Sequence, residues 1–247
     1  MVLFKETQME LNIIFPVLNE ELRLKTGIEN TVFYLQNSLP EVTCELTIVD
    51  NGSTDKTAEI ANALCACYSN VKYLSIKERG VGAAFRAGVN LNTRDIVGYM
   101  DIDLSTDLHH LSEVINIFLD NSNVEIVNAT RYSKDSTLLG RKWYRNFISY
   151  VLIFLLKLVF HMEASDAICG FKFFKKAAAE QLIEESSQET GWFFIIELLL
   201  RAEKNGYHIK ELPVKWTFEA HTKVKILKVT KNYLRQIWRL ACEFHKD

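Results

Sequence analysis

The sequence predicts an α/β fold with a mostly parallel sheet covered by helices on both faces. Two observations carry this prediction. Short apolar runs alternate with longer helical patterns through the first half of the 247-residue chain. These runs are nearly continuous, which is typical of parallel strands that are buried on both faces. A composition of 48% hydrophobic and 24% charged residues is that of an ordinary globular protein.

The first half is expected to hold five strands separated by four helices. The first strand ends near Pro16, and Ser53 or Thr54 can cap the second helix. The third helix is rich in alanine, and the fourth strand, DIVGYMDI, runs directly into carboxylates. The expected strands span residues 11–17, 45–50, 71–76, 95–102 and 124–132, and the expected helices span residues 20–38, 53–68, 80–91 and 111–120.

The second half has a less regular pattern and no linker rich in proline or glycine. The sequence therefore predicts one α/β domain over residues 1–223, followed by a basic amphipathic helix over residues 224–247. The expected elements are an apolar segment at about 143–162, a strand or turn at 166–174, a helix at 191–206, a strand at 208–216 and a helix at 225–244.

The charge distribution favours a membrane surface over nucleic acid as a partner. A formal net charge of −2 argues against a general nucleic-acid binder. Residues 204–247 nevertheless hold 10 Lys and Arg against 4 Asp and Glu, which suits an anionic surface. Five cysteines, an odd number, are typical of reduced thiols, and the first residues show no signal-peptide pattern. We therefore expect a cytoplasmic protein that associates peripherally with a membrane.

Two segments are candidates for membrane contact. Residues 147–160 are shorter than the ~20 apolar residues of a spanning helix, and the mixture RKWYR precedes them. This segment is either interfacial or a buried core helix. The apolar face of the tail helix lies either on lipid or on the domain. Its apolar positions are Ile226, Val229, Tyr233, Ile237, Leu240 and Phe244, and its basic stripe is Lys228, Lys231, Arg235 and Arg239.

Polar clusters follow the first four strands. Ligands of open α/β sheets bind beyond the carboxyl ends of the strands, so these clusters should form one site. Asp101 and Asp103 can converge there on Mg²⁺ or Mn²⁺, or form a solvated acidic turn. Asp50 can accept hydrogen bonds from a nucleobase or ribose, or simply shape a turn. Glu20 suits a sugar nucleotide, or a helix N-terminus.

Basic residues near the same edge are candidates for phosphate contacts. The stretch RGVGAAFRAG, residues 79–88, resembles a phosphate-binding glycine turn in which Arg79 or Arg86 would neutralise a phosphate. Close packing of helix on sheet explains its glycines and alanines equally well. Arg131 and Arg145 precede the apolar segment and are either ligands of a lipid phosphate or solvated.

Seven motifs together resemble the family 2 inverting glycosyltransferases, which have a Rossmann-like GT-A fold. Within that family they are most similar to polyprenyl-phosphate sugar transferases, such as dolichyl-phosphate glucosyl- and mannosyltransferases. The similarity runs from about Leu11 to Lys223. In order, the motifs are FPVLNEE, IVDNGSTDKT, RGVGAAFRAG, DIDLS, ATRY, DAICGFKFF and WFFIIELLLRAEKNGYHIKELPVKW.

The resemblance implies a UDP- or GDP-linked sugar donor, a divalent metal ion and inversion at the anomeric carbon. It places the metal and diphosphate on Asp101 and Asp103, and the acceptor phosphate on Arg131 and Arg145. By the same resemblance, Pro16, Glu20 and Asp50 would hold the nucleoside, and Asp166, Glu197 and Lys223 would shape the sugar and acceptor side. Arg79, from the glycine turn, is a further candidate for binding the nucleotide sugar.

The acceptor stays open at this point. Polyprenyl phosphate is already anionic and needs no strong general base, whereas a saccharide hydroxyl needs one, for which Asp166 and Glu197 are the candidates. A nucleotide-sugar-binding protein with little turnover is a further alternative. It is left open by two departures from the family pattern, Asn51 in place of a second aspartate and Val81 in place of a lysine. In addition, Ser105 stands where some relatives have glutamine, and EAHTKVK replaces the usual Gly-Ser-Lys ending.

Overall fold

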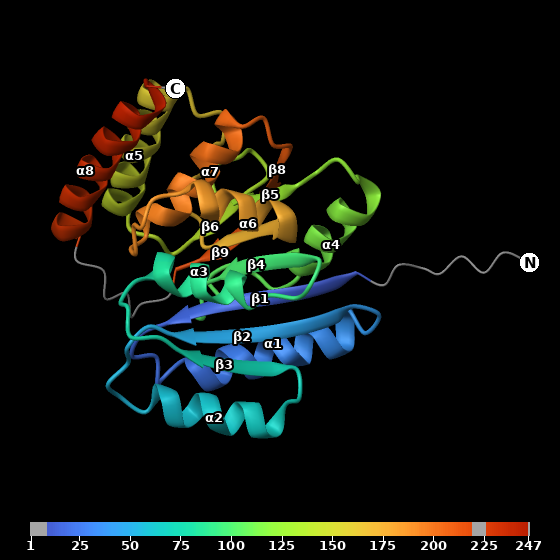
Figure 1. Ribbon diagram of the computed structural model, residues 1–247. Helices are drawn as coiled ribbons and strands as arrows, with labels where there is room; N and C mark the ends of the chain where they lie inside the picture. Colours follow the sequence, from blue (N-terminus) through green and yellow to red (C-terminus); the bar gives the residue numbers. More distant parts are fainter. Residues whose placement is uncertain (1–8, 219–225, 247) are drawn as a thin grey trace, which may run out of the picture.

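A seven-stranded sheet forms the centre of the protein, seen in a computed structural model that describes residues 9–218 and 226–246 (Figure 1). The strand order is β3-β2-β1-β4-β7-β5-β8, and β7 alone among them runs antiparallel to its neighbours. The expected mostly parallel α/β fold is therefore confirmed. The strands are β1 Glu10–Val17, β2 Thr43–Asp50, β3 Val71–Ser75, β4 Ile96–Met100, β5 Ile126–Thr130, β7 Phe171–Lys175 and β8 Ile209–Pro213.

Helices cover both faces of this sheet, which is why its strands are apolar throughout. In β1, Ile13 and Phe15 enter the core under α1, α2 and α4, while Ile14 enters the core under α3, α6 and α7. All three side chains are fully buried. The helices are α1 Leu24–Ser38, α2 Thr57–Cys67, α3 Val81–Asn90, α4 His110–Asp120, α5 Trp143–Phe160, α6 Lys176–Glu185, α7 Phe193–Lys204 and α8 Ile226–Phe244.

Several boundaries differ from the sequence expectation. Helix α2 begins at Thr57, not at residue 53, because Ser53 and Thr54 bind Asn19 of the neighbouring loop instead of capping the helix. The strand expected at 208–216 is two strands, since β9, Lys215–Thr217, leaves β8 and pairs with β6, Thr137–Leu139, in a small parallel sheet. Helix α6 and strand β6 were not anticipated.

The tail helix α8 packs on α5 and α7 (Figure 1), in a third core that includes Ile237 and Leu240. Its apolar face therefore lies on the protein, which decides between the two alternatives for that face. Leu234 and Trp238 remain exposed on its outer side. The expected boundary at residues 223–224 lies outside the described residues, as do the side chains of residues 226–230.

Helix α5 turns most of its apolar side chains outward. Within it, Ser149, Ile153 and Leu156 are buried, so the buried-core interpretation of this segment is wrong. The exposed apolar residues recur at spacings of three, four and seven, and therefore form one stripe along the helix. We call this the α5 stripe, and it consists of Trp143, Phe147, Tyr150, Val151, Phe154 and Leu158.

Candidate functional site

The loops after β1 and β2 are joined to each other at the carboxyl edge of the sheet. Asn19 adopts a left-handed backbone conformation, with φ of 55°. Its N–H donates to Ser53 Oγ at 2.8 Å, and its side-chain oxygen accepts the N–H of Thr54 at 2.8 Å. The N–H of Glu20 donates to Thr57 Oγ1 at 2.8 Å. These bonds hold Glu20 beside the end of β2, as the carboxyl-edge rule predicts. Pro16 lies one residue before the end of β1, opposite Val49.

Asp50 is buried at the end of β2 and shapes the turn that follows. Its Oδ1 accepts the N–H groups of Gly52 and Ser53, at 3.1 and 2.8 Å. Its Oδ2 accepts the hydroxyl of Tyr73 at 3.1 Å. The turn-shaping interpretation of Asp50 therefore applies, and its contact with a nucleoside stays a prediction. Arg79 is exposed, and its side chain passes 3.5 Å from the position of a Cβ on Gly52.

Asp101 and Asp103 each have one carboxylate oxygen tied to the protein. Asp101 Oδ1 accepts the Tyr99 hydroxyl at 2.9 Å, and Asp103 Oδ1 accepts the N–H of Ser105 at 3.0 Å. Desolvation, together with the charge of Asp103, raises the pKa of Asp101 to about 7. Two nearby carboxylates with unfilled lone pairs are the hard oxygen ligands that Mg²⁺ and Mn²⁺ prefer. The donor set therefore fits a divalent metal ion.

Gly170 leaves room for the Asp101 carboxylate. A Cβ on Gly170 would lie 1.9 Å from Asp101 Oδ2 and 2.4 Å from its Cγ. The carbonyl of Gly170 also accepts the N–H of Asp101 at 3.2 Å. The turn before β7 thus encloses one side of the acidic pair, and only glycine fits there without moving the carboxylate.

Gly170→Ala should therefore displace Asp101 and weaken Mn²⁺ binding by about tenfold or more, without altering any group that carries charge. Isothermal titration of Mn²⁺ with the purified variant, in the presence of UDP or GDP, measures this effect. A melting temperature within a few degrees of wild type shows that the fold is retained. Wild-type Mn²⁺ affinity in the variant would mean that the Asp101 carboxylate does not need this position.

Several N–H groups of the glycine turn at residues 79–88 are bonded within the protein, so close packing explains this turn better than phosphate binding does. At the start of α3, the N–H groups of Gly82 and Ala83 both donate to the Thr190 carbonyl, at 2.8 and 3.1 Å. The N–H of Gly80 donates to Asn51 Oδ1 at 3.1 Å. Three N–H groups of this turn are therefore already bonded within the protein. Close packing explains the glycine at position 82, because a Cβ there would lie 2.5 Å from Cβ of Phe194.

Asn51 has a structural reason to be an amide. Its Nδ2 donates to the carbonyl of Val17 at 2.8 Å while its Oδ1 accepts from Gly80, so it joins the ends of β1 and β2 to α3. An aspartate could not donate to Val17. Arg86 is also structural, since it donates to the carbonyls of Ser187 and Glu189 and lies over the Phe194 ring.

Arg131 and Asp166 form a buried ion pair. Nε and Nη2 of Arg131 donate to the two Asp166 oxygens at 2.7 and 3.1 Å. Asp166 also accepts the N–H groups of Arg131, Ile168 and Cys169. Although burial alone would raise it, the pKa of Asp166 is lowered, chiefly by the Arg131 charge. This carboxylate is fully bonded and is poorly suited to act as a general base.

Arginine and aromatic side chains gather between β5, β9 and the start of α5. The guanidinium of Arg131 lies 5.5 Å from the Trp216 ring centre, Arg141 lies 5.6 Å from the same ring, and Arg145 lies 5.5 Å from Phe218. Nε of Arg145 is buried and has no hydrogen-bond partner among the described residues. We call Arg131, Arg141, Arg145, Trp216 and Phe218 the arginine–aromatic cluster.

The arginine–aromatic cluster is tied to the loop that carries Asp103. The N–H of Thr217 donates to the Ser105 carbonyl at 2.7 Å, and Thr106 forms a β-bridge with Trp216. Arg131 also contributes to the electrostatic environment of Asp101. The structure thus brings the acidic pair and this cluster to one edge of the sheet.

Glu197 lies within the contact between α7 and α8. Its carboxylate accepts hydrogen bonds from Ser187, Arg201 and Arg239, and its side chain is fully buried. In this position it connects the helices. A catalytic role for Glu197 stays a prediction, and Lys223 lies outside the described residues.

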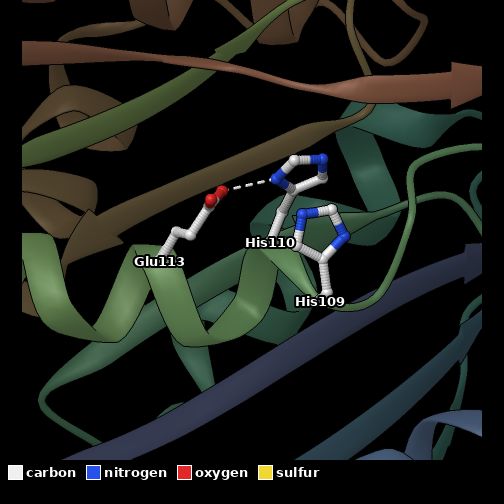
Figure 2. A group of neighbouring side chains, drawn as sticks. All are labelled: His109, His110 and Glu113. Carbon is white, nitrogen blue, oxygen red and sulfur yellow. Dashed lines mark hydrogen bonds and ion pairs between the residues drawn. The ribbon is translucent and has the colours of Figure 1, made fainter. Parts of the chain in front are cut away.

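His109, His110 and Glu113 are close enough to suggest a second metal site (Figure 2). The bonding of His110 argues against it. Its Nε2 accepts the backbone N–H of Lys215 at 2.8 Å, which leaves the proton on Nδ1, and Nδ1 lies 2.5 Å from Glu113. A metal on Nδ1 would require the proton to move to Nε2, where it would face the Lys215 N–H. The group therefore fastens β9 to α4.

Sequence reasoning missed four residues at or beside the site. They are Arg23, Gly170, Lys172 and Trp216. Arg23 binds Glu20 at i and i+3, a spacing that the sequence does show. Lys172 is a fully buried lysine that donates to Asn128 Oδ1 and to the Cys169 carbonyl, and only the fold reveals that pairing.

Comparison with known proteins supports a transferase with this fold. The family model described as Glycosyl transferase family 2 matches residues 12–183. Dolichyl-phosphate beta-glucosyltransferase from Homo sapiens is 28% identical, over 94% of this chain and 78% of its own length. Glycosyltransferase AglD from Haloferax volcanii is 29% identical over 94% of this chain. The chain spans only 38% of the length of AglD.

Solved structures agree on the fold. Glucosyl-3-phosphoglycerate synthase from Mycobacterium tuberculosis, in complex with Mn²⁺, uridine-diphosphate and glucosyl-3-phosphoglycerate, superposes with a TM-score of 0.68 at 17% identity. The match covers 93% of this chain and 77% of that one. An identity this low shows the GT-A fold alone, whereas the family match extends over more than half of the sequence. The family match, in agreement with the GT-A fold and the acidic pair at the carboxyl edge of its sheet, shows that the chain belongs to glycosyltransferase family 2.

Proposed function

We propose that this glycosyltransferase moves a sugar from a UDP- or GDP-linked donor to a polyprenyl phosphate at the cytoplasmic face of a membrane. The observation that carries the proposal is the position of the arginine–aromatic cluster at the first turn of α5. Arg141 and Arg145 stand where the α5 stripe begins. Cations that can bind a phosphate therefore adjoin an exposed apolar surface that can meet the lipid.

Asp101 and Asp103 would hold the divalent metal ion, and Pro16, Glu20, Asp50 and Arg79 would form the side of the site that receives the nucleotide part of the donor. When bound, such an ion neutralises charge on the leaving nucleoside diphosphate. That the solved relative carries Mn²⁺ and uridine-diphosphate in its complex supports this donor class. The name of the human relative supports a dolichyl-phosphate acceptor.

The bonding of the two candidate bases favours a phosphate acceptor over a saccharide hydroxyl. Asp166 accepts five hydrogen bonds from Arg131, Ile168 and Cys169. Glu197 is enclosed by Ser187 and two arginines. An anionic phosphate oxygen attacks without losing a proton, so neither carboxylate has to act as a base. A saccharide acceptor would require one of them to leave its partners.

The proposal is tested by supplying the purified protein with Mn²⁺ or Mg²⁺, UDP- or GDP-sugars, and either polyprenyl phosphate or soluble saccharides. We expect release of nucleoside diphosphate that depends on polyprenyl phosphate, with formation of a sugar–phospholipid. Transfer to saccharides without transfer to polyprenyl phosphate would show the alternative acceptor. Nucleotide-sugar binding without turnover would show the binding protein.

Peripheral membrane association through the α5 stripe is the second part of the proposal. By length and composition alone, α5 is long and apolar enough to cross a membrane, but core helices pass the same test. The stripe faces outward and begins with Trp143, and Lys142, Tyr144 and Arg145 are its neighbours in sequence at this end. Aromatic and basic residues at one end of an apolar face are typical of a helix lying in the membrane interface.

Replacing both Phe154 and Leu158 with glutamate should reduce binding to vesicles of phosphatidylcholine and phosphatidylglycerol by at least about tenfold, since each apolar side chain contributes roughly 1.5–3 kcal/mol when buried. Both side chains are exposed, at 67% and 64%, so the melting temperature should not fall. Leu119→Glu is the matched control because that residue is 58% exposed on α4. Equal vesicle binding by the double variant and the control would contradict this role.

A further inference from the structure

Arg23 connects two residues that sequence analysis placed in different parts of the site. Its Nε and Nη2 donate to the two oxygens of Glu20, each at 2.7 Å. Its remaining terminal nitrogen, Nη1, lies 3.8 Å from Asp103 Oδ2. One edge of the guanidinium is therefore held by a carboxylate, while Nη1 faces the candidate metal ligand.

The bidentate pair changes what Glu20 can do. Both of its oxygens are engaged by Arg23, and its side chain is only 14% exposed. A carboxylate in this arrangement fixes the orientation of an arginine, because the two parallel hydrogen bonds allow one geometry. Glu20 thus acts as a positioning residue for Arg23, which differs from its expected role as a direct ligand of the nucleoside.

Arg23 faces the Asp103 oxygen that a metal would use. Asp103 Oδ1 is held by the N–H of Ser105, so Oδ2 is the oxygen turned toward the site. The distance from Nη1 to Oδ2 is longer than a hydrogen bond, so the contact is an ion pair only. The N–H groups of Nη1 can therefore still donate to another anion. A divalent ion on Oδ2 would meet the arginine charge unless an anion lay between them.

We propose that Arg23 makes the donor diphosphate and the divalent ion bind cooperatively. Without nucleotide, its charge opposes the ion at Asp103; with nucleotide, Nη1 donates to the diphosphate that the ion also binds. This inference rests on the proposed donor class and adds a diphosphate-binding residue to it. Arg23 thereby supplies a positive charge to the diphosphate. This charge is relevant because position 81 holds valine, and because the N–H groups of Gly80, Gly82 and Ala83 are bonded within the protein.

The proposal predicts opposite changes in two affinities of Arg23→Gln. Mn²⁺ alone should bind severalfold more tightly than to wild type, because the competing charge is gone. The gain in Mn²⁺ affinity on adding UDP or GDP should shrink by about tenfold or more, since a charge-assisted hydrogen bond to the diphosphate is lost. Free Mn²⁺ measured by electron paramagnetic resonance, with and without nucleotide, reports both quantities without requiring turnover.

Matched variants separate this role from a general structural one. Lys25→Gln removes one positive charge two residues away, in the first turn of α1, and should behave as wild type. The Lys25 side chain is 69% exposed, and among the ion pairs described it pairs only with Glu29, at 3.9 Å. Glu20→Gln should lose part of the coupling because it releases Arg23. Arg23→Lys keeps the positive charge but cannot form the bidentate hydrogen bonds to Glu20. It should therefore bind Mn²⁺ alone as weakly as wild type, and lose part of the coupling between Mn²⁺ and nucleotide binding.

The outcomes are distinguishable. Unchanged coupling in Arg23→Gln, with wild-type nucleotide binding, overturns this inference and leaves the donor proposal in place. Weaker binding of Mn²⁺ alone, together with a lower melting temperature, also overturns it, because that result indicates a structural role. If wild type binds neither UDP nor GDP in the presence of Mn²⁺, the donor proposal and this inference fail together.

Discussion

Asp103→Asn is expected to lower sugar transfer by about a thousandfold, because it removes one of two charges from the candidate metal site. The substitution is nearly isosteric. The amide oxygen can still accept the N–H of Ser105, so the turn should persist. The amide nitrogen then takes the place of Oδ2, which faces Arg23 and the site. A donor nitrogen there cannot bind a cation.

Release of nucleoside diphosphate at increasing Mn²⁺ concentrations measures this loss, and the melting temperature reports the fold. The matched control is Asp107→Asn, in the same loop. Asp107 binds His109 and Lys215 and lies outside the acidic pair, so its variant should keep most of the activity. Retention of more than about a tenth of wild-type activity by Asp103→Asn would contradict the metal assignment.

Asp166→Asn is expected to lower the free energy of unfolding by about 3–5 kcal/mol, since it leaves the Arg131 charge buried without its partner. Arg131 and Asp166 have side-chain exposures of 5% and 0%. No orientation of an asparagine amide restores the bonding. Both oxygens of Asp166 accept from donors, so the new NH₂ group faces N–H groups in either orientation.

Urea denaturation at pH 7 measures this change. Because the folded pKa of Asp166 is lowered, its contribution is present above the unfolded pKa of about 3.9 and is lost as the pH falls through the folded value. The difference between variant and wild type should therefore narrow in acid. Glu180→Gln is the control, because its pair with Lys176 is exposed and should change stability by less than about 1 kcal/mol. An equally small effect at Asp166 would contradict the account of this pair.

Periodicity and topology were enough to predict the sheet and the edge that carries the site. Continuous apolar strands such as β1 occur only where both faces are covered, so the pattern of Ile13, Ile14 and Phe15 already implied helices on each side. Parallel strands end at one edge, which places Glu20, Asp50 and Asp101 together although they lie far apart in the chain.

The partners of the polar residues could not be predicted in the same way. Arg131 and Asp166 are 35 residues apart, directly after β5 and in the turn before β7, and nothing local marks them as a pair. The Thr190 carbonyl accepts two N–H groups at the start of α3, from Gly82 and Ala83, which lie more than a hundred residues away in the chain. Residue type gives the charge of a side chain and the number of hydrogen bonds that it can form. Which of those bonds are already made within the protein depends on which segments the fold brings together.

By itself, the amino-acid sequence determined the α/β class, the order of the first nine elements and the acidic pair at the end of the fourth strand, because these depend on local periodicity and on the direction of parallel strands. Tertiary structure alone decided that α8 lays its apolar face on the protein while α5 turns its stripe outward. Both helices are amphipathic or apolar in sequence. Which face is buried depends on what packs against it, and that is a property of the assembled chain.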